Sequence, residues 1–298
     1  MRKTRSDRVF DVVNILLMSM VLLIMFYPLY YIVIASFSEP AAVAMGKVYL
    51  WPKGFTTEAY GNVFKNERIW TGYRNTIIYT VFGTMLNLIL TIPTAYVLSK
   101  KTLKGRSIIS WYFLIPMYFS GGLIPTYLLV KSMNLLNQPY TIIILGGLSI
   151  YNMVVARTYF TNSIPDELYE SARIDGANDF LCFFKIALPL AAPIIAVMTL
   201  YYGVSRWNDY YTSLIYVGQS KYQPLQLVLR SILIDNESSL VFDDNMNETD
   251  LLLTTRRQYM AEAMKYSVIF IASAPLLVAY PFVQKYFVKG MMIGSLKG

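Results

Sequence analysis

Long apolar stretches separated by short polar segments dominate this chain of 298 residues. A bilayer core about 30 Å thick takes about 20 apolar residues in an α-helix, at a rise of about 1.5 Å per residue. The stretch 12–35 meets that length, with Asn14 as its one strongly polar residue. Five further stretches approach it, at about 76–98, 108–130, 140–156, 186–210 and 266–288. A buried soluble core explains one such stretch but not six, so the pattern predicts a polytopic, all-α membrane protein.

The placement of charge orients these predicted spans. Charged residues make up 15% of the chain, against about 25% in soluble proteins, and the net charge is +8. Basic residues cluster before the first span (2–8), between the second and third (100–106) and after the last (285–297). The positive-inside bias places all three clusters in the cytoplasm, although further basic residues in the first outside loop weaken the asymmetry.

The prediction is therefore a single transmembrane domain covering 1–298, with six helices and both termini cytoplasmic. Its two largest connections are a cytoplasmic loop at 163–189 and an external loop at about 211–261. We expect contact with membrane lipid and no nucleic acid, because the basic clusters follow the membrane topology.

The composition also excludes several kinds of chemistry. The chain has no histidine and one cysteine, Cys182, which removes histidine-activated nucleophiles and the common zinc ligand sets. It has no Gly-x4-Gly-Lys-Ser/Thr sequence for binding nucleotide phosphates. We therefore expect no catalytic residue, no metal and no cofactor bound by this chain.

The polar segment 163–189 stands out between two predicted spans. Ser163 and Asp166 have the spacing of a capping box at the start of a helix. Gly176 is suited to end that helix, because glycine adopts positive φ without strain. The pattern predicts a short helix at the cytoplasmic surface, with small residues that let another surface approach.

A second short helix is predicted to follow. Asn178 or Asp179 can cap it, and Leu188-Pro189 is expected to turn the chain into the fifth span. From the residues alone, an amphipathic linker lying in the membrane interface explains this helix–turn–helix equally well.

The same segment resembles the EAA loop of importer-type ABC permeases. The matching residues, in the family's order and spacing, are Glu170, Ser171, Ala172, Asp175, Gly176, Ala177, Leu188 and Pro189. Ser171 departs from the pattern, which prefers alanine there. Two further segments, Trp207-Asn208-Asp209 and the C-terminal 281–298, resemble elements of maltose-type carbohydrate permeases, in the branch linked to complex oligosaccharides and polysaccharide fragments.

The resemblance implies the type I permease fold and a heteromeric importer in the bacterial cytoplasmic membrane. The implied partners are a second homologous permease subunit, two cytoplasmic ATPase subunits that bind ATP and Mg²⁺, and an extracellular or periplasmic solute-binding protein. The EAA residues would form the coupling helix that contacts an ATPase, and carbohydrate would cross by alternating access.

Candidate residues for the substrate pathway lie at the end of the fifth predicted span: Arg206, Trp207, Asn208, Asp209 and Tyr210. Ionisable residues at membrane depth are candidates for function, and Arg206 and Asp209 have the spacing to pair on one helical face. Aromatic rings and amides suit the C–H faces and hydroxyls of sugars. An interfacial belt of aromatic residues is the competing explanation for the tyrosines.

Two other functions remain open from the sequence. An ABC importer permease for a non-sugar solute shares the EAA loop, so the carbohydrate assignment depends on the two further segments. A stand-alone secondary transporter is the alternative from another class, and it predicts paired membrane carboxylates or inverted repeats.

Overall fold

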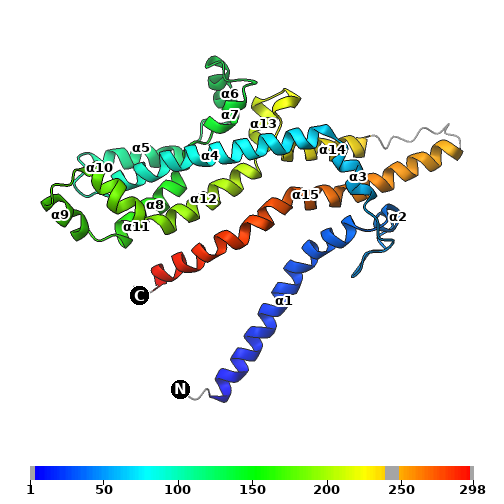
Figure 1. Ribbon diagram of the computed structural model, residues 1–298, viewed down its shortest axis with the longest axis horizontal. Coiled ribbons are helices and arrows are strands. Elements are labelled where there is room, and N and C mark those ends of the chain that lie inside the picture. Colours follow the sequence, from blue (N-terminus) through cyan, green and yellow to red (C-terminus); the bar gives the residue numbers. More distant parts are fainter. Residues whose placement is uncertain (1–3, 239–247, 296–298) are drawn as a thin grey trace. The chain divides into compact units, whose positions relative to one another are not determined.

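The computed structural model describes residues 4–238 and 248–295, and all the regular elements in those residues are helical (Figure 1). The predicted all-α fold is confirmed. Residues 239–247 of the predicted external loop, and 296–298 at the C-terminus, lie outside the described part. The elements are α1 (Arg5–Ser36), α2 (Pro40–Ala44), α3 (Glu58–Phe64), α4 (Glu67–Ser99), α5 (Arg106–Tyr118), α6 (Leu123–Ser132), α7 (Pro139–Ile144), α8 (Ile150–Ser163), α9 (Glu167–Ile174), α10 (Asp179–Leu181), the π-helix η1 (Cys182–Ala187), α11 (Leu188–Leu190), α12 (Ala192–Trp207), α13 (Tyr211–Tyr216), the 3₁₀ helix η2 (Ser220–Tyr222), α14 (Leu225–Ser238) and α15 (Glu248–Ser295).

Five of the six predicted spans correspond to helices, or bent helix pairs, that are long and apolar enough to cross a membrane. Within the described residues, three are continuous: Asp7–Ser36, Glu67–Ser99 and Leu252–Val278. Two are bent pairs, α5–α6 at 114° and the Asp179–Leu190 segment with α12 at 75°. Gly122, which begins the second half of α5–α6, has a φ of 84° that favours glycine.

The predicted fourth span, 140–156, is broken into two helices. α7 and α8 are separated by residues 145–149, and neither helix alone has the length of a span. The predicted external loop, 211–261, is also largely structured, because it contains α13, η2, α14 and the first part of α15.

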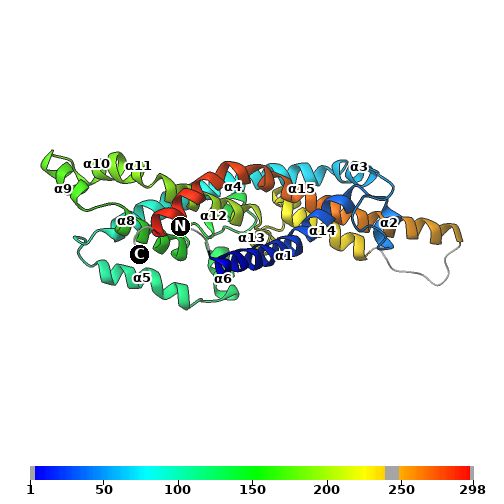
Figure 2. The same cartoon turned by 90° about the horizontal axis from the view of Figure 1, so that it is seen from below.

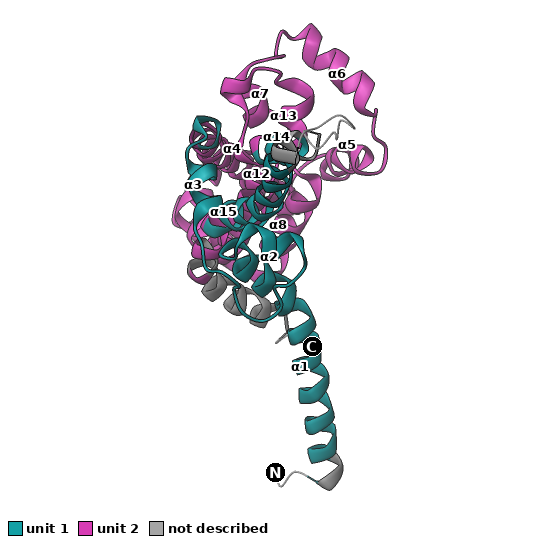
Figure 3. Ribbon diagram, turned by 90° about the vertical axis from the view of Figure 1, so that its right-hand side faces the viewer, with its two compact units in different colours: residues 1–69, 229–274 teal, residues 70–228, 275–298 magenta. Residues whose placement is uncertain are grey.

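The chain divides into two compact units, coloured separately in Figure 3. The first comprises 1–69 and 229–274. Its core gathers the end of α1 and the segment after it, with Ile34, Ala35, Val43 and Val48 packed beside Tyr266 of α15. The most apolar part of α1 has no buried residue, which leaves that surface for lipid or a neighbouring subunit.

The second unit comprises 70–228 and 275–298. Its main core lies where α4, α8, α9, η1 and α12 meet, and a smaller core joins α4, α6, α7 and α13. In Figures 1 and 2, α9 and α10 lie together at one end of this unit, away from α7 and α13. Helix α4 contributes to both cores and therefore connects the two ends.

In this unit, the first turns of α4 form hydrogen bonds with the segment that leads into α14. Asn75 donates from Nδ2 to the carbonyls of Lys221 and Gln223, at 2.8 and 3.0 Å. The Thr76 hydroxyl accepts from the Leu225 amide at 2.8 Å. The backbones approach closely because residue 72 is glycine: a Cβ there would lie 3.0 Å from the Leu225 Cα.

The close backbone contact at Gly72 predicts that alanine substitutions at two helical glycines have opposite effects on stability. Gly72→Ala should destabilise the protein by about 1–3 kcal/mol, because backbone atoms cannot move aside cheaply. Gly61→Ala in α3, where nothing lies within 4 Å of the added Cβ, should stabilise it by about 0.5–1 kcal/mol. The measurement is the thermal unfolding midpoint in detergent, and equal midpoints for the two variants would contradict the packing described.

Candidate functional site

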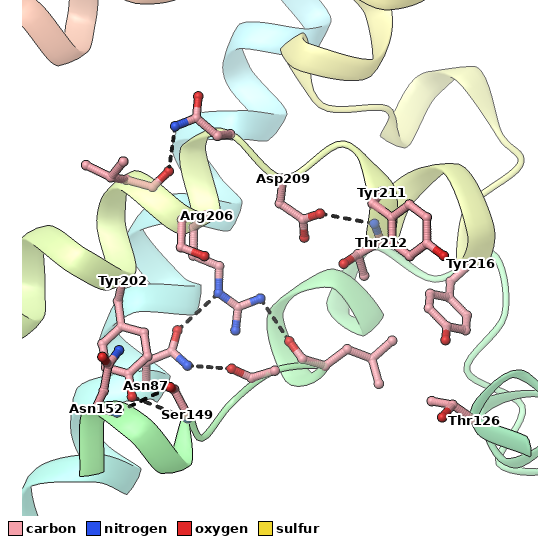
Figure 4. Close-up of a pocket in the computed structure, with 15 residues that line it drawn as sticks. Asn87, Thr126, Ser149, Asn152, Tyr202, Arg206, Asp209, Tyr211, Thr212 and Tyr216 are labelled. Carbon is pink, nitrogen blue, oxygen red and sulfur yellow. Dashed lines mark hydrogen bonds between the residues drawn. The ribbon is translucent and has the colours of Figure 1, made fainter. Parts of the chain in front are cut away.

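A polar cavity of about 710 Å³ lies in the second unit, among α4, α6, the α7–α8 break, α12 and α13 (Figure 4). Three of the five predicted pathway residues line it: Arg206, Asn208 and Asp209. Trp207 and Tyr210 do not. The remaining lining residues are Asn87, Thr126, Leu145, Gly146, Ser149, Asn152, Tyr202, Val204, Ser205, Tyr211, Thr212 and Tyr216.

Arg206 forms the back wall of the cavity and is 9% exposed. Its Nη1 donates to the carbonyls of Ile142 and Leu145, at 2.6 and 2.9 Å, and its Nη2 donates to that of Ile143 at 3.1 Å. These carbonyls end α7 and have lost their helical partners. The guanidinium therefore caps α7, where a positive charge is also favoured by the helix dipole.

Asn87 of α4 completes this network and is fully buried. Its Oδ1 accepts from Arg206 Nε at 3.0 Å, and its Nδ2 donates to the carbonyls of Gly146 and Gly147 at 2.7 and 2.8 Å. Together the two side chains donate hydrogen bonds to five backbone carbonyls at the break, those of Ile142, Ile143, Leu145, Gly146 and Gly147. We call this set of contacts the Arg206–Asn87 network.

The predicted pairing of Arg206 with Asp209 is not formed. Within the described residues the guanidinium bonds only to Asn87 and the α7–α8 carbonyls. Asp209 instead accepts the Thr212 amide at 3.0 Å and so helps to begin α13. The spacing was suitable for an ion pair, but orphaned carbonyls from another part of the chain compete for the guanidinium.

The other predicted pathway residues have structural contacts. Trp207 is 6% exposed and packs edge-on against Tyr73 of α4, with ring centroids 6.3 Å apart. Asn208 is exposed, and its Nδ2 donates to the Val204 carbonyl of its own helix at 3.0 Å. Tyr210 lies at the N-cap of α13.

Tyr202 joins three elements at the inner end of the cavity. Its hydroxyl lies 2.7 Å from that of Thr91 on α4, and it accepts from the Ser149 amide at 3.3 Å. Ser149 in turn accepts the Asn152 amide and caps α8. Sequence reasoning missed Asn87 and Tyr202. The signal for Asn87 was its position as the strongly polar residue in an otherwise apolar span.

The predicted coupling segment 163–189 contains α9, α10, η1 and the start of α11, and it joins the main core of the second unit through Tyr169 of α9 and Cys182 and Ala187 of η1. Gly176 follows α9 with a φ of 85°, and nothing lies within 4 Å of an added Cβ, so the conformation alone explains the glycine. Asn178 Oδ1 accepts the Leu181 amide at 2.9 Å, which confirms the predicted cap of the second helix.

Two local predictions for this segment are wrong. Ser163 ends α8 rather than capping α9, and the N-cap of α9 is Asp166, whose side chain makes no capping hydrogen bond. The chain also does not turn at Leu188-Pro189: Pro189 lies in α11, which continues the helical segment Asp179–Leu190 directly after the π-helix η1. The bend comes at Ala191 instead.

Most of the coupling residues are available at the surface. Glu170, Ser171, Asp175 and Gly176 are exposed, while Ala172, Ala177 and Leu188 are half-buried and pack on the core. Pro189 is exposed as well. Two apolar side chains that the motif did not single out, Ile174 and Phe180, are 86% and 76% exposed.

Residues 69–293 match the family described as "Binding-protein-dependent transport system inner membrane component", and the chain belongs to that family. It is therefore a multi-pass inner-membrane permease subunit of an ABC transporter and not itself a catalytic subunit.

The relatives cover the whole chain. It is similar to Protein LplC of Bacillus subtilis strain 168, with 39% identity over all of this chain and 98% of that protein. It is also similar to the polygalacturonan/rhamnogalacturonan transport system permease protein YtcP of the same strain, with 36% identity over 98% of this chain and 100% of that protein. A solved bacterial ABC transporter involved in the import of the acidic polysaccharide alginate contains a chain 36% identical, with a TM-score of 0.84 over 96% of this chain and 99% of that one.

The Arg206–Asn87 network predicts a ranking of stabilities. Arg206→Met should lower the free energy of unfolding by at least about 3 kcal/mol, because several carbonyls lose their donors. Arg206→Lys keeps the positive charge but lacks the planar guanidinium. Its free energy of unfolding should therefore lie between those of Arg206→Met and the unaltered protein. Asn208→Ala, in the same cavity wall, should change stability by a few tenths of a kcal/mol. Thermal unfolding of the purified complex measures all three, and a midpoint for Arg206→Met equal to that of Asn208→Ala contradicts the capping role.

Proposed function

We propose that this chain carries uronate-containing oligosaccharides across the membrane, as one of two permease subunits in an ATP-driven, binding-protein-dependent importer. The polar cavity carries the proposal, because it lies in a chain that matches an alginate importer subunit over nearly its whole length. The relative named for polygalacturonan and rhamnogalacturonan transport supports the same class of cargo.

The lining of the cavity suits a sugar. Hydroxyl groups of Thr126, Tyr211, Thr212 and Tyr216 and the amide of Asn152 line it alongside aromatic rings. Hydroxyls and amides both donate and accept hydrogen bonds, as sugar hydroxyls do. The volume of about 710 Å³ falls within the range of pockets that hold small ligands.

The force for transport comes, in this proposal, from two partner ATPases that contact the α9–α10 segment. Glu170 and Asp175 of the EAA match present exposed carboxylates there, and Ile174 and Phe180 add apolar side chains that an interface would bury. ATP and Mg²⁺ bind to those partners. A solute-binding protein delivers the sugar from outside, and the bent α5–α6 and α11–α12 segments allow the cavity to open alternately to each side.

The function is tested by uptake into proteoliposomes that contain the full complex and its binding protein. Labelled trigalacturonate is expected to accumulate only with internal ATP, and maltotriose to accumulate much less. Uptake without ATP would overturn the importer assignment, and uptake of maltotriose alone would overturn the uronate assignment.

A matched pair on α13 tests the cavity. Tyr211 lines it and is 54% exposed, while Leu214 on the same helix does not line it and is 52% exposed. Tyr211→Ala should reduce uptake about tenfold, because loss of sugar stacking and one hydrogen bond amounts to about 1.4 kcal/mol or more. Leu214→Ala should transport at the normal rate. Equal uptake by the two variants speaks against this cavity as the sugar pathway.

A second pair tests the coupling segment. Gly176→Val forces a β-branched residue to positive φ, so the α9–α10 turn should change shape and the ATPases should no longer copurify. Ser171→Ala should assemble and transport normally, because among the described residues the Ser171 hydroxyl donates only to the Leu168 carbonyl of its own helix. Copurification of the ATPases with Gly176→Val at the normal ratio would argue against this docking site.

A further inference from the structure

Helix α9 is anchored to the rest of its unit by one fully buried side chain, Tyr169, which is 6% exposed. Its charged contacts lie at the surface. Lys101 meets Asp166 at 3.2 Å with side chains 74% and 61% exposed, and such exposed pairs contribute little. A force applied to α9 therefore reaches the membrane helices mainly through the surroundings of Tyr169.

Those surroundings are a cluster of rings and one cation around Tyr96 of α4. The Tyr96 ring lies 6.0 Å from that of Tyr169, 5.7 Å from that of Phe160 on α8 and 5.0 Å from that of Phe183 in η1. The Nζ of Lys100 lies 2.8 Å from the Tyr169 ring centroid and 4.6 Å from that of Tyr96. Lys100 thus bridges the last turn of α4 and α9.

The bridging group is a partly desolvated cation. Burial lowers the pKa of Lys100 to about 8, with Arg173 lowering and Asp166 and Asp179 raising it. The amine therefore keeps its proton at pH 7 while it has lost part of its hydration. Cation–π contacts are strongest in this condition, because less water competes for the charge.

Helix α4 leads from this cluster to the cavity. Thr91, five residues before Tyr96, meets the Tyr202 hydroxyl, and Asn87, nine residues before it, belongs to the Arg206–Asn87 network. At about 1.5 Å per residue, the cluster and the network are about 13 Å apart along one helix. Pro93 lies between them and removes one backbone hydrogen bond, but α4 continues as one helix from Glu67 to Ser99, so a movement of its last turn reaches the cavity wall through a single helix.

We propose that Lys100 is a positioning residue that locks α9 onto α4, so that displacement of α9 moves α4 and with it the wall of the cavity. The inference rests on the proposed function, in which the ATPases push on α9. Lys100 contacts neither ATP nor sugar and acts through Tyr169 and Tyr96.

The neighbouring lysines provide the test. Lys100→Met retains the aliphatic stem and removes the cation, and Lys101→Met removes the exposed ion pair. Each variant is reconstituted as the full complex, and trigalacturonate uptake and ATP hydrolysis are measured together. We expect Lys100→Met to hydrolyse ATP at close to the normal rate while uptake per ATP falls about tenfold. Lys101→Met should keep the normal ratio of uptake to ATP hydrolysis. Lys100→Arg should also show a near-normal ratio, because a guanidinium binds ring faces as well.

A normal ratio of uptake to hydrolysis in Lys100→Met overturns the inference. If that variant does not assemble, the same ratio is measured for Tyr169→Leu, which keeps Lys100 but removes the ring, and for Tyr169→Phe, which keeps the ring. A normal ratio of uptake to ATP hydrolysis in Tyr169→Leu then overturns the inference as well. Failure of the proposed function is recognised separately, because Gly176→Val would then retain its ATPases whatever the Lys100 variants do.

Discussion

The fold depends on hydrogen-bond donors for the backbone carbonyls at the break between α7 and α8, in the predicted fourth span. Five of the six carbonyls from Ile142 to Gly147, all but that of Ile144, are bound by side chains of other helices, and a bilayer offers no water to replace those donors. A guanidinium from α12 and an amide from α4 supply the donors. The break is thereby fixed to two other helices, and a segment that would be costly in lipid becomes the wall of a polar cavity.

Helix α4 gains its importance from that arrangement. It contributes Asn87 to the network, Thr91 to the contact with Tyr202, and Tyr96 to the aromatic cluster under α9. The three side chains lie along one helix between α9 and the cavity. In the proposed coupling, a shift of α4, which contains Pro93 between Thr91 and Tyr96, would carry a displacement of α9 to the cavity wall.

The sequence predicted what local chemistry determines. The helical class, five of the spans, the positive φ of Gly176 and the Asn178 cap follow from runs of apolar residues and from the preferences of single residues. The Ser163 cap and the Leu188-Pro189 turn failed locally, because α8 extends to Ser163 and the helical segment extends to Leu190. The predicted contacts of the pathway residues failed because they required knowledge of distant partners. The spacing of Arg206 and Asp209 permitted an ion pair, but carbonyls about 60 positions earlier in the chain took the guanidinium. Asn87 was missed for the same reason, since its partners come from the break and from α12.

If sugar crosses through this cavity as proposed, the network limits which side chains are available to bind it. A guanidinium has five N–H donors, and Arg206 uses four of them on Asn87 and the backbone. Asn87 uses both of its N–H donors on the break and its Oδ1 on Arg206, so neither side chain can turn toward a substrate without releasing the break. In the proposed pathway, recognition would therefore fall to side chains such as Thr126 on α6 and Tyr211 on α13, which lie across the cavity from Asn87 (Figure 4). A change of cargo within the family is then expected to alter α6 and α13 while α4 and α12 keep the cavity intact.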